Sequence, residues 1–197
     1  MAKLEKIVPF ILHFESGVPL SYLNKSNEEI FERSKKTGLA NDPADRGGLT
    51  MCGVTYATYA SYCNKKGKKA TAEGLKALKY SEWLEILKTM FWDRWKADEI
   101  KDDWVAINLV DWVWASGLTG VKRPQRLLGV TADGIVGPIT LAAVNSADPK
   151  QFFQKIHDDR LKHFDEIVAR SASQKKFLKG WRRRVNAIEY GRFNFNV

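Results

Sequence analysis

The sequence of 197 residues lacks several features that would define a class of protein at once. It has only two cysteines, Cys52 and Cys63, and no cluster of His, Cys, Asp or Glu with the spacing of metal ligands. No apolar run reaches the roughly 18–20 residues of a membrane span, and no long repeat or low-complexity segment occurs. We therefore expect no metal, no cofactor and no stable membrane insertion. Free buried thiols are expected, with a disulfide between the two cysteines as the alternative.

The N-terminus also lacks the pattern of a secretory leader. Residues 1–6 are followed only by a short apolar stretch, residues 7–12, which Pro9 interrupts and which no small-residue cleavage site follows. The expectation is synthesis in the cytoplasm without a signal peptide. Any action outside the cell would then follow export by another route or cell lysis.

Positive charge is in excess, and it is unevenly distributed. Residues 1–118 carry 17 Lys and Arg against 16 Asp and Glu, whereas residues 119–197 carry 15 against 7. A basic surface of this kind attracts polyanions such as nucleic acid, an anionic membrane or an anionic wall polymer. Hydrophobic content of 44% with seven Trp is enough for a packed core, so the chain is expected to form one domain or two small ones.

The first segment predicts a helix that ends at a carboxylate. Apolar residues recur at helical spacing from Leu4 to Leu12, and Pro9 predicts a kink or a short first turn before it. Ser16-Gly17 is a plausible C-terminal cap. Glu15 is therefore expected at a helix end, where a side chain can point into a cleft.

The remaining chain reads as helices with one Gly-rich turn. Residues 41–55 predict a turn with a short hairpin arm, after which Thr55 caps a helix; Ser81 is expected to cap another. Residues 104–116 are apolar on most sides except at Asp111, which predicts a central helix. The further expectations are a domain seam at Gly117 and Gly120, helices over 138–144, 149–168 and 174–190, and a loose tail over 191–197.

Several blocks of this sequence resemble one known family. Glu15-Ser16-Gly17, the stretch from Asn41 to Thr50 and Gly53-Val54-Thr55 look like the N-terminal signature of the glycoside hydrolase family 108 muramidases, which include phage endolysins and secretion activator proteins. Phe91-Trp92-Asp93 and residues 111–117 match the next two blocks. Residues 125–144 and 180–185 resemble the C-terminal peptidoglycan-binding region of that family.

The resemblance implies a fold, a domain division and an activity. The implied fold is mainly α-helical and lysozyme-like, with a small β-hairpin or Gly-rich turn near the active site and a C-terminal helical peptidoglycan-binding region. Residues 1–118 would be the muramidase domain, residues 119–190 the peptidoglycan-binding region and residues 191–197 a tail. The family's catalytic carboxylate falls on Glu15. Two departures from the family are visible. The usual Glu-Gly-Gly-Tyr reads Glu15-Ser16-Gly17-Val18, and about two dozen residues are inserted before the Asn-Asp-Pro motif.

Glycosidic cleavage needs an acid for the leaving oxygen and stabilisation of an oxocarbenium-like transition state. Glu15 is our candidate general acid, with Phe14 as part of an apolar wall that would keep it protonated. Asp45 is the first choice for the ionised partner and Asp42 the second, and Thr50 is a candidate to position a water. Both aspartates and Thr50 fit equally well a structural role in bonding turn amides.

Four further residues are candidates for substrate binding: Tyr22, Gly48, Asp111 and Trp114. For Asp111 the competing interpretation is a buried polar group with partners that supports the site indirectly. Arg182 to Arg184 are expected to form a solvated face, with contact to the acidic stem peptides of the wall as the alternative.

Three functions remain as hypotheses. The first is a monomeric peptidoglycan hydrolase acting on the bacterial cell wall, in the periplasm or outside the cell. The second is a catalytically weakened wall-binding or secretion accessory protein, which the departures beside Glu15 motivate. The third is a nucleic-acid binder, ranked last because no groove-reading motif accompanies the basic C-terminal third.

Overall fold

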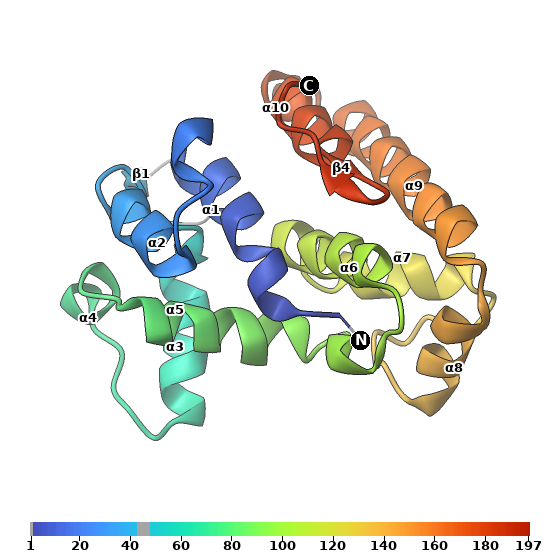
Figure 1. The fold of residues 1–197 in the computed structure, drawn as a ribbon, viewed down its shortest axis with the longest axis horizontal. Helices are drawn as coiled ribbons and strands as arrows, with labels where there is room; N and C mark the ends of the chain where they lie inside the picture. Colours follow the sequence, from blue (N-terminus) through green and yellow to red (C-terminus); the bar gives the residue numbers. More distant parts are fainter. Residues whose placement is uncertain (1, 43–47) are drawn as a thin grey trace. The chain divides into compact units, whose positions relative to one another are not determined.

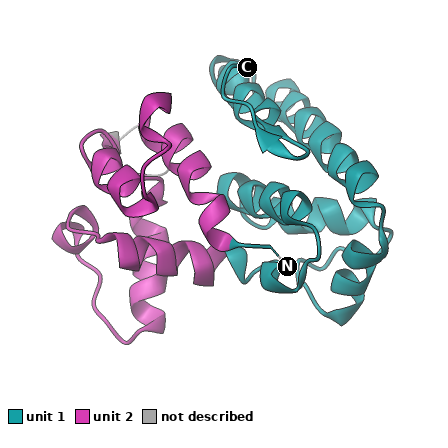
Figure 2. Ribbon diagram, in the orientation of Figure 1, with its two compact units in different colours: residues 1–3, 92–197 teal, residues 4–91 magenta. Residues whose placement is uncertain are grey.

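The computed structural model describes residues 2–42 and 48–197, which form a mainly α-helical protein with a few short strands (Figure 1). The predicted fold class is confirmed. The described chain divides into two compact units (Figure 2). Unit 2 comprises residues 4–91, and unit 1 comprises residues 92–197 with the residues before Leu4.

Unit 2 contains five α-helices and a three-stranded antiparallel sheet with strand order β1-β2-β3. Its elements are η1 (Leu4–Lys6), α1 (Val8–Ser16), η2 (Leu20–Tyr22), α2 (Asn27–Lys35), β1 (Leu39–Asp42), β2 (Gly48–Met51), β3 (Val54–Thr55), α3 (Tyr56–Lys65), α4 (Ala72–Lys76) and α5 (Tyr80–Leu87). The π-helical turn η3 (Lys88–Trp92) follows α5.

Helix α1 begins and ends where the sequence predicted. A short 3-10 turn precedes it, and Pro9 lies in its first turn, where a missing N–H leaves no hydrogen bond unmade. Gly17 ends the helix in the left-handed region (φ 67°), and its N–H bonds the carbonyl of His13. The middle of α1 is fully buried, which fixes the position of its C-terminal end.

Side-chain caps mark the starts of the next helices, α2 and α3. Ser26 and Glu29 form a reciprocal capping box at the start of α2. Thr55 accepts a hydrogen bond from the N–H of Thr58 and so caps α3, as predicted. The predicted cap at Ser81 is wrong, because α5 starts at Tyr80 and Ser81 lies inside its first turn.

Gly38 joins α2 to the sheet through backbone hydrogen bonds. Its N–H bonds the carbonyl of Ser34 at 2.7 Å, and its carbonyl accepts from the N–H of Cys52 at 2.8 Å. A Cβ at this position would lie 2.8 Å from the Ser34 carbonyl oxygen and 2.9 Å from the sulfur of Cys52. Cys52 and Cys63 are both free and buried, which confirms that prediction.

Unit 1 is a helical assembly that closes with a two-stranded hairpin. Its elements are η4 (Ala97–Glu99), α6 (Asp103–Ser116), α7 (Thr119–Leu127), α8 (Pro138–Ser146), α9 (Pro149–Arg170), η5 (Ala172–Gln174), α10 (Lys175–Asn186), β4 (Ile188–Glu189) and β5 (Arg192–Phe193). Helix α6 packs against α7 and α9, and α9 packs against α10.

Helix α6 is the central helix that its apolar sequence predicted. Asp102 caps it by accepting hydrogen bonds from the N–H groups of Trp104 and Val105 at 2.9 Å each. Residues 105–113 are all buried. A helix that is apolar on every side can be stable in water only at the centre of its unit.

The predicted domain seam at Gly117 and Gly120 stays a prediction, although the compact units divide near residue 91. Gly120 lies inside α7, and both α6 and α7 belong to unit 1. A Cβ on Gly120 would come within 2.5 Å of backbone atoms of Trp112 and Val113. The glycine is there because it lets the backbones of two packed helices approach closely.

The C-terminal end departs from the expectation of one long helix and a loose tail. Helix α10 ends at Asn186, and β4 and β5 pair through Ile188 with Phe193 and Glu189 with Arg192. Phe193 packs edge-on against Trp104 with ring centroids 5.0 Å apart. Tertiary contacts with the start of α6 therefore order residues that have no strong local signal.

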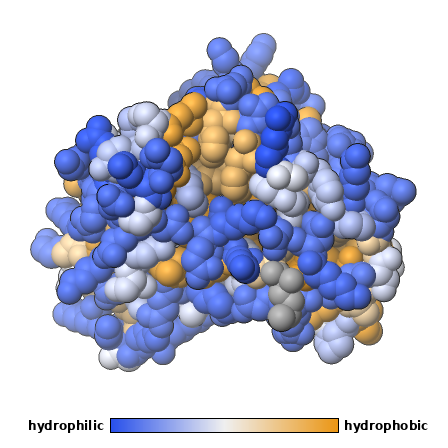
Figure 3. All heavy atoms as spheres, in the orientation of Figure 1, coloured by the Kyte–Doolittle hydropathy of each residue, from blue (hydrophilic) through white to orange (hydrophobic). Residues whose placement is uncertain are grey.

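Hydrophilic residues cover most of the face shown in Figure 3, and hydrophobic residues appear there in smaller patches. Within the described residues, none of the helices combines the length and the hydropathy needed to cross a bilayer.

We expect Gly120→Ala to destabilise unit 1 by about 1–3 kcal/mol, because the added methyl group meets rigid backbone and not a movable side chain. Gly137→Ala is the matched control, since a Cβ there has no neighbour within 4 Å. Chemical denaturation followed by circular dichroism measures both variants. Equal midpoints for the two variants would contradict the close approach of α6 and α7.

Candidate functional site

Glu15 occupies the last turn of α1, and the chain on either side of it is held in place. It is half-buried, between the half-buried Phe14 and the buried Ser16. The hydroxyl of Ser16 bonds the carbonyl of Leu12 at 2.5 Å, and the hydroxyl of Thr37 bonds the carbonyl of Ser16 at 2.6 Å. The backbone that carries Glu15 is therefore tied both to its own helix and to the segment after α2.

Aromatic rings surround the same helix end. Phe14 packs against Phe10 with centroids 4.8 Å apart, and His13 meets Phe14 edge-on at 5.1 Å. The Nδ1 of His13 lies 2.6 Å from the carbonyl oxygen of Val18, so this histidine is hydrogen-bonded to the segment after α1. These rings provide an apolar flank along the side of α1 that leads to Glu15.

The end of α1 also lies within electrostatic reach of the sheet. Burial raises the pKa of the Cys52 thiol to about 12, and the negative charges of Glu32 and Glu15 add to this rise against the opposing charge of Lys35. The hydroxyl of Thr37 bonds the carbonyl of Ser16, and the carbonyl of neighbouring Gly38 accepts from the N–H of Cys52, so one short segment links the end of α1 to the turn between β2 and β3. Unit 2 thus brings Glu15 to the sheet that carries the Gly-rich motif.

Thr50 and Gly48 lie on β2, the central strand of that sheet. Thr50 pairs in register with Ala40 on β1 and with Thr55 on β3, and its hydroxyl bonds the carbonyl of Gly48 at 3.2 Å. Gly48 adopts a positive φ of 57° at the start of the strand, a conformation that favours glycine. Half-buried Thr50 remains a candidate to position a water, and the backbone geometry alone accounts for the glycine at position 48.

The two candidate partner carboxylates fall at the edge of what is described. Asp45 lies outside the described residues, within 43–47. Asp42 is the last residue of β1, where its backbone pairs with Gly48. The antiparallel pairing of β1 and β2 therefore holds the backbones of Asp42 and Gly48 opposite each other.

Tyr22 lies beside a surface groove of about 390 Å³ in unit 2. The groove is otherwise lined by polar and charged residues of the α2 region: Ser26, Glu28, Glu29, Glu32, Arg33 and Lys36. Glu15 is not among the residues that line it. Tyr22 therefore belongs to a groove formed by the inserted segment of residues 18–40.

In unit 1, Asp111 is the centre of a buried charge cluster. Its side chain is 0% exposed and accepts hydrogen bonds from Arg160 at 2.5 Å and from Arg184 at 2.8 and 3.0 Å. Arg160 also donates to the side-chain oxygen of Asn108 at 2.7 Å and lies over the ring of Trp112. The carboxylate has no surface open to a ligand within its unit, so the geometry matches the buried-partner interpretation and not direct substrate contact.

Burial opposes ionisation of Asp111, but the guanidinium groups of Arg184 and Arg160 outweigh it and hold the pKa below its usual range. Since α6 carries Asp111, α9 carries Arg160 and α10 carries Arg184, this cluster links three helices. The prediction that Arg182 to Arg184 form a solvated face is wrong for Arg184. It holds for Arg182, which is exposed and pairs at the surface with Asp165.

Trp114 lies half-buried near the C-terminal end of α6. Part of its indole surface is therefore exposed on unit 1, as a sugar-stacking role would require. Its role in substrate binding stays a prediction.

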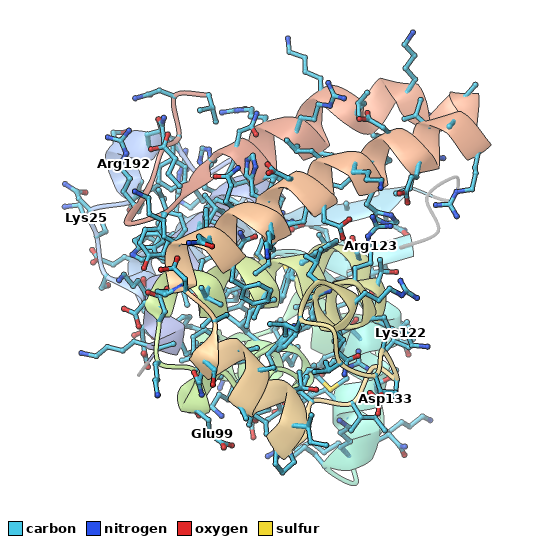
Figure 4. All side chains as sticks on the ribbon, turned by 90° about the vertical axis from the view of Figure 1, so that its right-hand side faces the viewer. Lys25, Glu99, Lys122, Arg123, Asp133 and Arg192 are labelled. Atoms are coloured by element: carbon cyan, nitrogen blue, oxygen red, sulfur yellow. The ribbon has the colours of Figure 1, made fainter. Side chains whose placement is uncertain are left out.

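Gln125 organises a loop that sequence reasoning did not single out. This fully buried amide donates to Asp133 and to the carbonyl of Ile135, both at 3.0 Å, and accepts from the N–H of Gly134 at 2.9 Å (Figure 4 labels Asp133). Ile135 of this loop and Ile139 at the start of α8 are 70% and 76% exposed, beside a pocket of about 280 Å³. Buried hydrogen bonds thus hold two apolar side chains at the surface, which is a feature of a binding region.

Arg123 forms a second charge cluster, between α7 and α9 (Figure 4). It donates to Asp159 at 2.6 and 2.8 Å and to Glu166 at 2.7 Å. Burial lowers the pKa of neighbouring His163, and the charge of Arg123 adds to this effect. Sequence reasoning missed this cluster, although the spacing of Asp159, His163 and Glu166 by four and three residues already predicts one polar face of α9.

Comparison with known protein families identifies two regions of the chain. Residues 33–117 match the family Glycosyl hydrolase 108, and residues 119–186 match the Predicted Peptidoglycan domain. The two matches confirm the resemblance that the sequence blocks indicated, and together they indicate a peptidoglycan hydrolase family with glycoside hydrolase activity. Glu15 precedes the matched range of the first family, so its assignment rests on the motif and geometry described above.

Among solved structures, the chain is similar to that of SagA from Brucella abortus. The two share 25% sequence identity with a TM-score of 0.71, over 94% of this chain and 90% of SagA. The likeness therefore extends through both units of the chain. A search of the curated proteins gave no match.

We expect Asp111→Asn to destabilise the protein by about 3–5 kcal/mol at neutral pH, because it leaves two guanidinium groups, one of them fully buried, without their counter-charge. Asp165→Asn is the matched control: it removes an exposed partner of Arg182 and should change stability little. Urea denaturation of the wild type and both variants measures the difference.

The pH dependence follows from the lowered pKa. An unfolded Asp titrates near about 3.9, and folded Asp111 titrates below it, so the cluster contributes fully above the unfolded value and loses its contribution as pH falls through the folded one. The difference between wild type and Asp111→Asn should therefore shrink below about pH 4. A difference that stayed constant down to pH 2 would contradict an ionised Asp111.

Proposed function

We propose that the chain is an N-acetylmuramidase of the lysozyme class, which cleaves the glycan strand of peptidoglycan with Glu15 as general acid. One observation carries the proposal: a glycosyl hydrolase 108 region and a peptidoglycan domain follow one another in the same chain. The support for Glu15 is its half-buried position at a firmly held helix end, which Thr37 and Gly38 link to the turn between β2 and β3.

The chemistry needs a carboxylic acid that stays protonated until the substrate arrives. Glu15 would give its proton to the oxygen that links the two sugars, and the C–O bond to the departing sugar would break. The neighbouring Phe14 and Phe10 rings form an apolar flank beside the helix end that carries Glu15.

A second, ionised carboxylate would stabilise the positive charge that develops on the sugar ring. Asp45 is our first choice and Asp42 the second, because both belong to the Gly-rich motif of residues 41–55. Thr50, on β2, would position the attacking water. A carboxyl separation of about 6.5–9.5 Å corresponds to inversion, and one of about 5–5.5 Å to retention through a covalent intermediate.

The division of labour follows the two family regions. Residues 1–118 would carry out hydrolysis, and residues 119–190 would hold the enzyme on the wall as a monomer without metal or cofactor. Tyr22, Gly48 and Trp114 remain candidates for contact with the glycan. Asp111 would serve this function indirectly, by fixing the helices of unit 1.

The rival proposal is a wall-binding or secretion accessory protein whose catalysis has weakened, motivated by Ser16 and Val18 in place of the family's Gly and Tyr. The geometry favours the enzyme. Val18 is 1% exposed, and the hydroxyl of Ser16 is bonded to its own helix. Both departures therefore face the protein interior, where they do not alter the surface that a substrate would meet.

We expect Glu15→Gln to lower the rate of peptidoglycan lysis by about 10²–10⁴-fold, because the amide cannot supply the proton. The measurement is the fall in turbidity of purified cell walls, with release of reducing sugar followed in parallel. Glu73→Gln is the matched control, since Glu73 is an exposed glutamate of the same unit, on α4. It should lyse walls at the wild-type rate.

The outcome separates the two proposals. Lysis by Glu15→Gln at the wild-type rate would overturn the general-acid assignment. Wall pelleting by the wild type without any release of reducing sugar would instead support the accessory protein. Unchanged thermal unfolding of Glu15→Gln would exclude misfolding as the reason for a lost activity.

A further inference from the structure

Helix α10 presents a basic face with an exposed aromatic ring and a glycine at its centre. Its twelve residues include six cations and no carboxylate: Lys175, Lys176, Lys179, Arg182, Arg183 and Arg184. Figure 4 shows long side chains with nitrogen tips projecting outward from this helix. Arg182 and Arg184 hold the ion pairs with Asp165 and Asp111 described above, and Arg183 has an interaction of its own.

The aromatic part of the face is ordered by stacking. Phe177 is 46% exposed and stacks on Trp181 at 5.9 Å with an interplanar angle of 27°. Trp181 in turn packs against Phe164 of α9 at 5.4 Å. Lys176 lies over the Phe177 ring at 4.8 Å. The part of Phe177 that these contacts leave uncovered faces solvent.

Gly180 lies between the aromatic and the basic parts of this face. On an α-helix it is three residues from Phe177 and from Arg183 and four from Lys176, so these side chains surround it. A Cβ at Gly180 would have no neighbour within 4 Å, and the residue is exposed inside a regular helix. Glycine weakens a helix at such a position, and neither the backbone nor the packing of unit 1 requires it.

A glycine that the fold does not require leaves a flat area beside an aromatic ring. We propose that Lys176, Phe177 and Gly180 form a glycan shelf, which binds a sugar ring of peptidoglycan over Gly180, against the exposed part of Phe177. The ammonium group of Lys176 binds a carboxylate of the attached stem peptides. The apolar side of a sugar ring packs against an aromatic side chain, and Lys complements its acidic substituents.

Charge complementarity selects this occupant. A neutral glycan would leave the cation of the shelf unused, while an anionic membrane would require a larger apolar surface than Phe177 alone supplies, since Val185 is buried and Trp181 and Leu178 are partly covered. The shelf lies within residues 119–186, the range of the peptidoglycan domain, and it rests on the proposed function in taking peptidoglycan as ligand.

The test uses the full chain with Glu15→Gln, so that the walls are not digested during binding. Sedimentation with purified peptidoglycan sacculi measures the bound fraction against protein concentration. Gly180→Leu should weaken binding at least 10-fold, because its side chain covers the shelf, while the melting temperature rises by about 2–4 °C through better helix propensity. Stability and binding would then move in opposite directions, which loss of folding cannot produce.

Two further variants separate the contributions of the shelf. Phe177→Ala should weaken binding about 10-fold, and Lys176→Gln about 3-fold with a shallower dependence on salt. Lys162→Gln is the matched control, an exposed lysine of α9 outside the shelf, and should bind as the parent does. Sacculi whose carboxylates have been converted to amides should retain the parent protein poorly.

Several results would overturn the shelf. These are unchanged binding of Gly180→Leu to sacculi, full retention on the amidated sacculi, or no binding of the parent. Anionic phospholipid vesicles and double-stranded DNA are run beside the sacculi. A Phe177→Ala effect confined to either would assign the face to that ligand instead. The proposed function fails separately, if Glu15→Gln lyses walls like the wild type.

Discussion

The ion cluster around Asp111 is the interaction on which the arrangement of unit 1 depends. One buried carboxylate receives two guanidinium groups, and the three residues come from α6, α9 and α10. Burying a charge costs free energy unless partners and hydrogen bonds replace its lost hydration. Misplacing any one of the three helices would leave an uncompensated charge in the interior, so the cluster favours one packing of these helices over all others.

Unit 2 is organised by backbone contacts and apolar packing. Gly38 connects α2 to the turn between β2 and β3, and the hydroxyl of Thr37 reaches back to the end of α1. The carbonyl that accepts this hydrogen bond belongs to Ser16, the residue directly after Glu15. Hydrogen bonds to the backbone carbonyls at the C-terminal end of α1 thus fix the position of Glu15. Catalysis would then rely on a side chain that the fold already holds in position.

Local signals in the sequence predicted the elements whose limits are set locally. Pro9 and Gly17 act through their own backbone geometry, and Thr55 through a cap, so α1 and α3 begin or end where expected. The exceptions have tertiary causes. Gly120 looked like a linker residue but lies at the contact of two helices, and the tail after residue 190 is ordered by Phe193 on Trp104.

The sequence predicted single residues of the candidate site but not the partners that surround them. The sequence marked Asp111 as a buried exception in an apolar helix, but its partners lie 49 and 73 residues further along the chain. No periodicity links positions so far apart. Gln125 was hidden for another reason: an amide inside an amphipathic pattern looks like a surface residue until the loop that it holds is seen.

The cluster and the shelf are connected through α10. Arg184 is bonded to Asp111, and the exposed Gly180 and Phe177 lie four and seven residues before it on the same stripe of the helix. Because this stripe is anchored by the buried ion pair and by Trp181 on Phe164, it is held rigid before any ligand arrives. A pre-organised surface loses little conformational entropy on binding. The free energy that holds three helices together therefore also lowers the cost of presenting a flat, basic face to an anionic glycan, and a single helix links the stability of unit 1 to its binding.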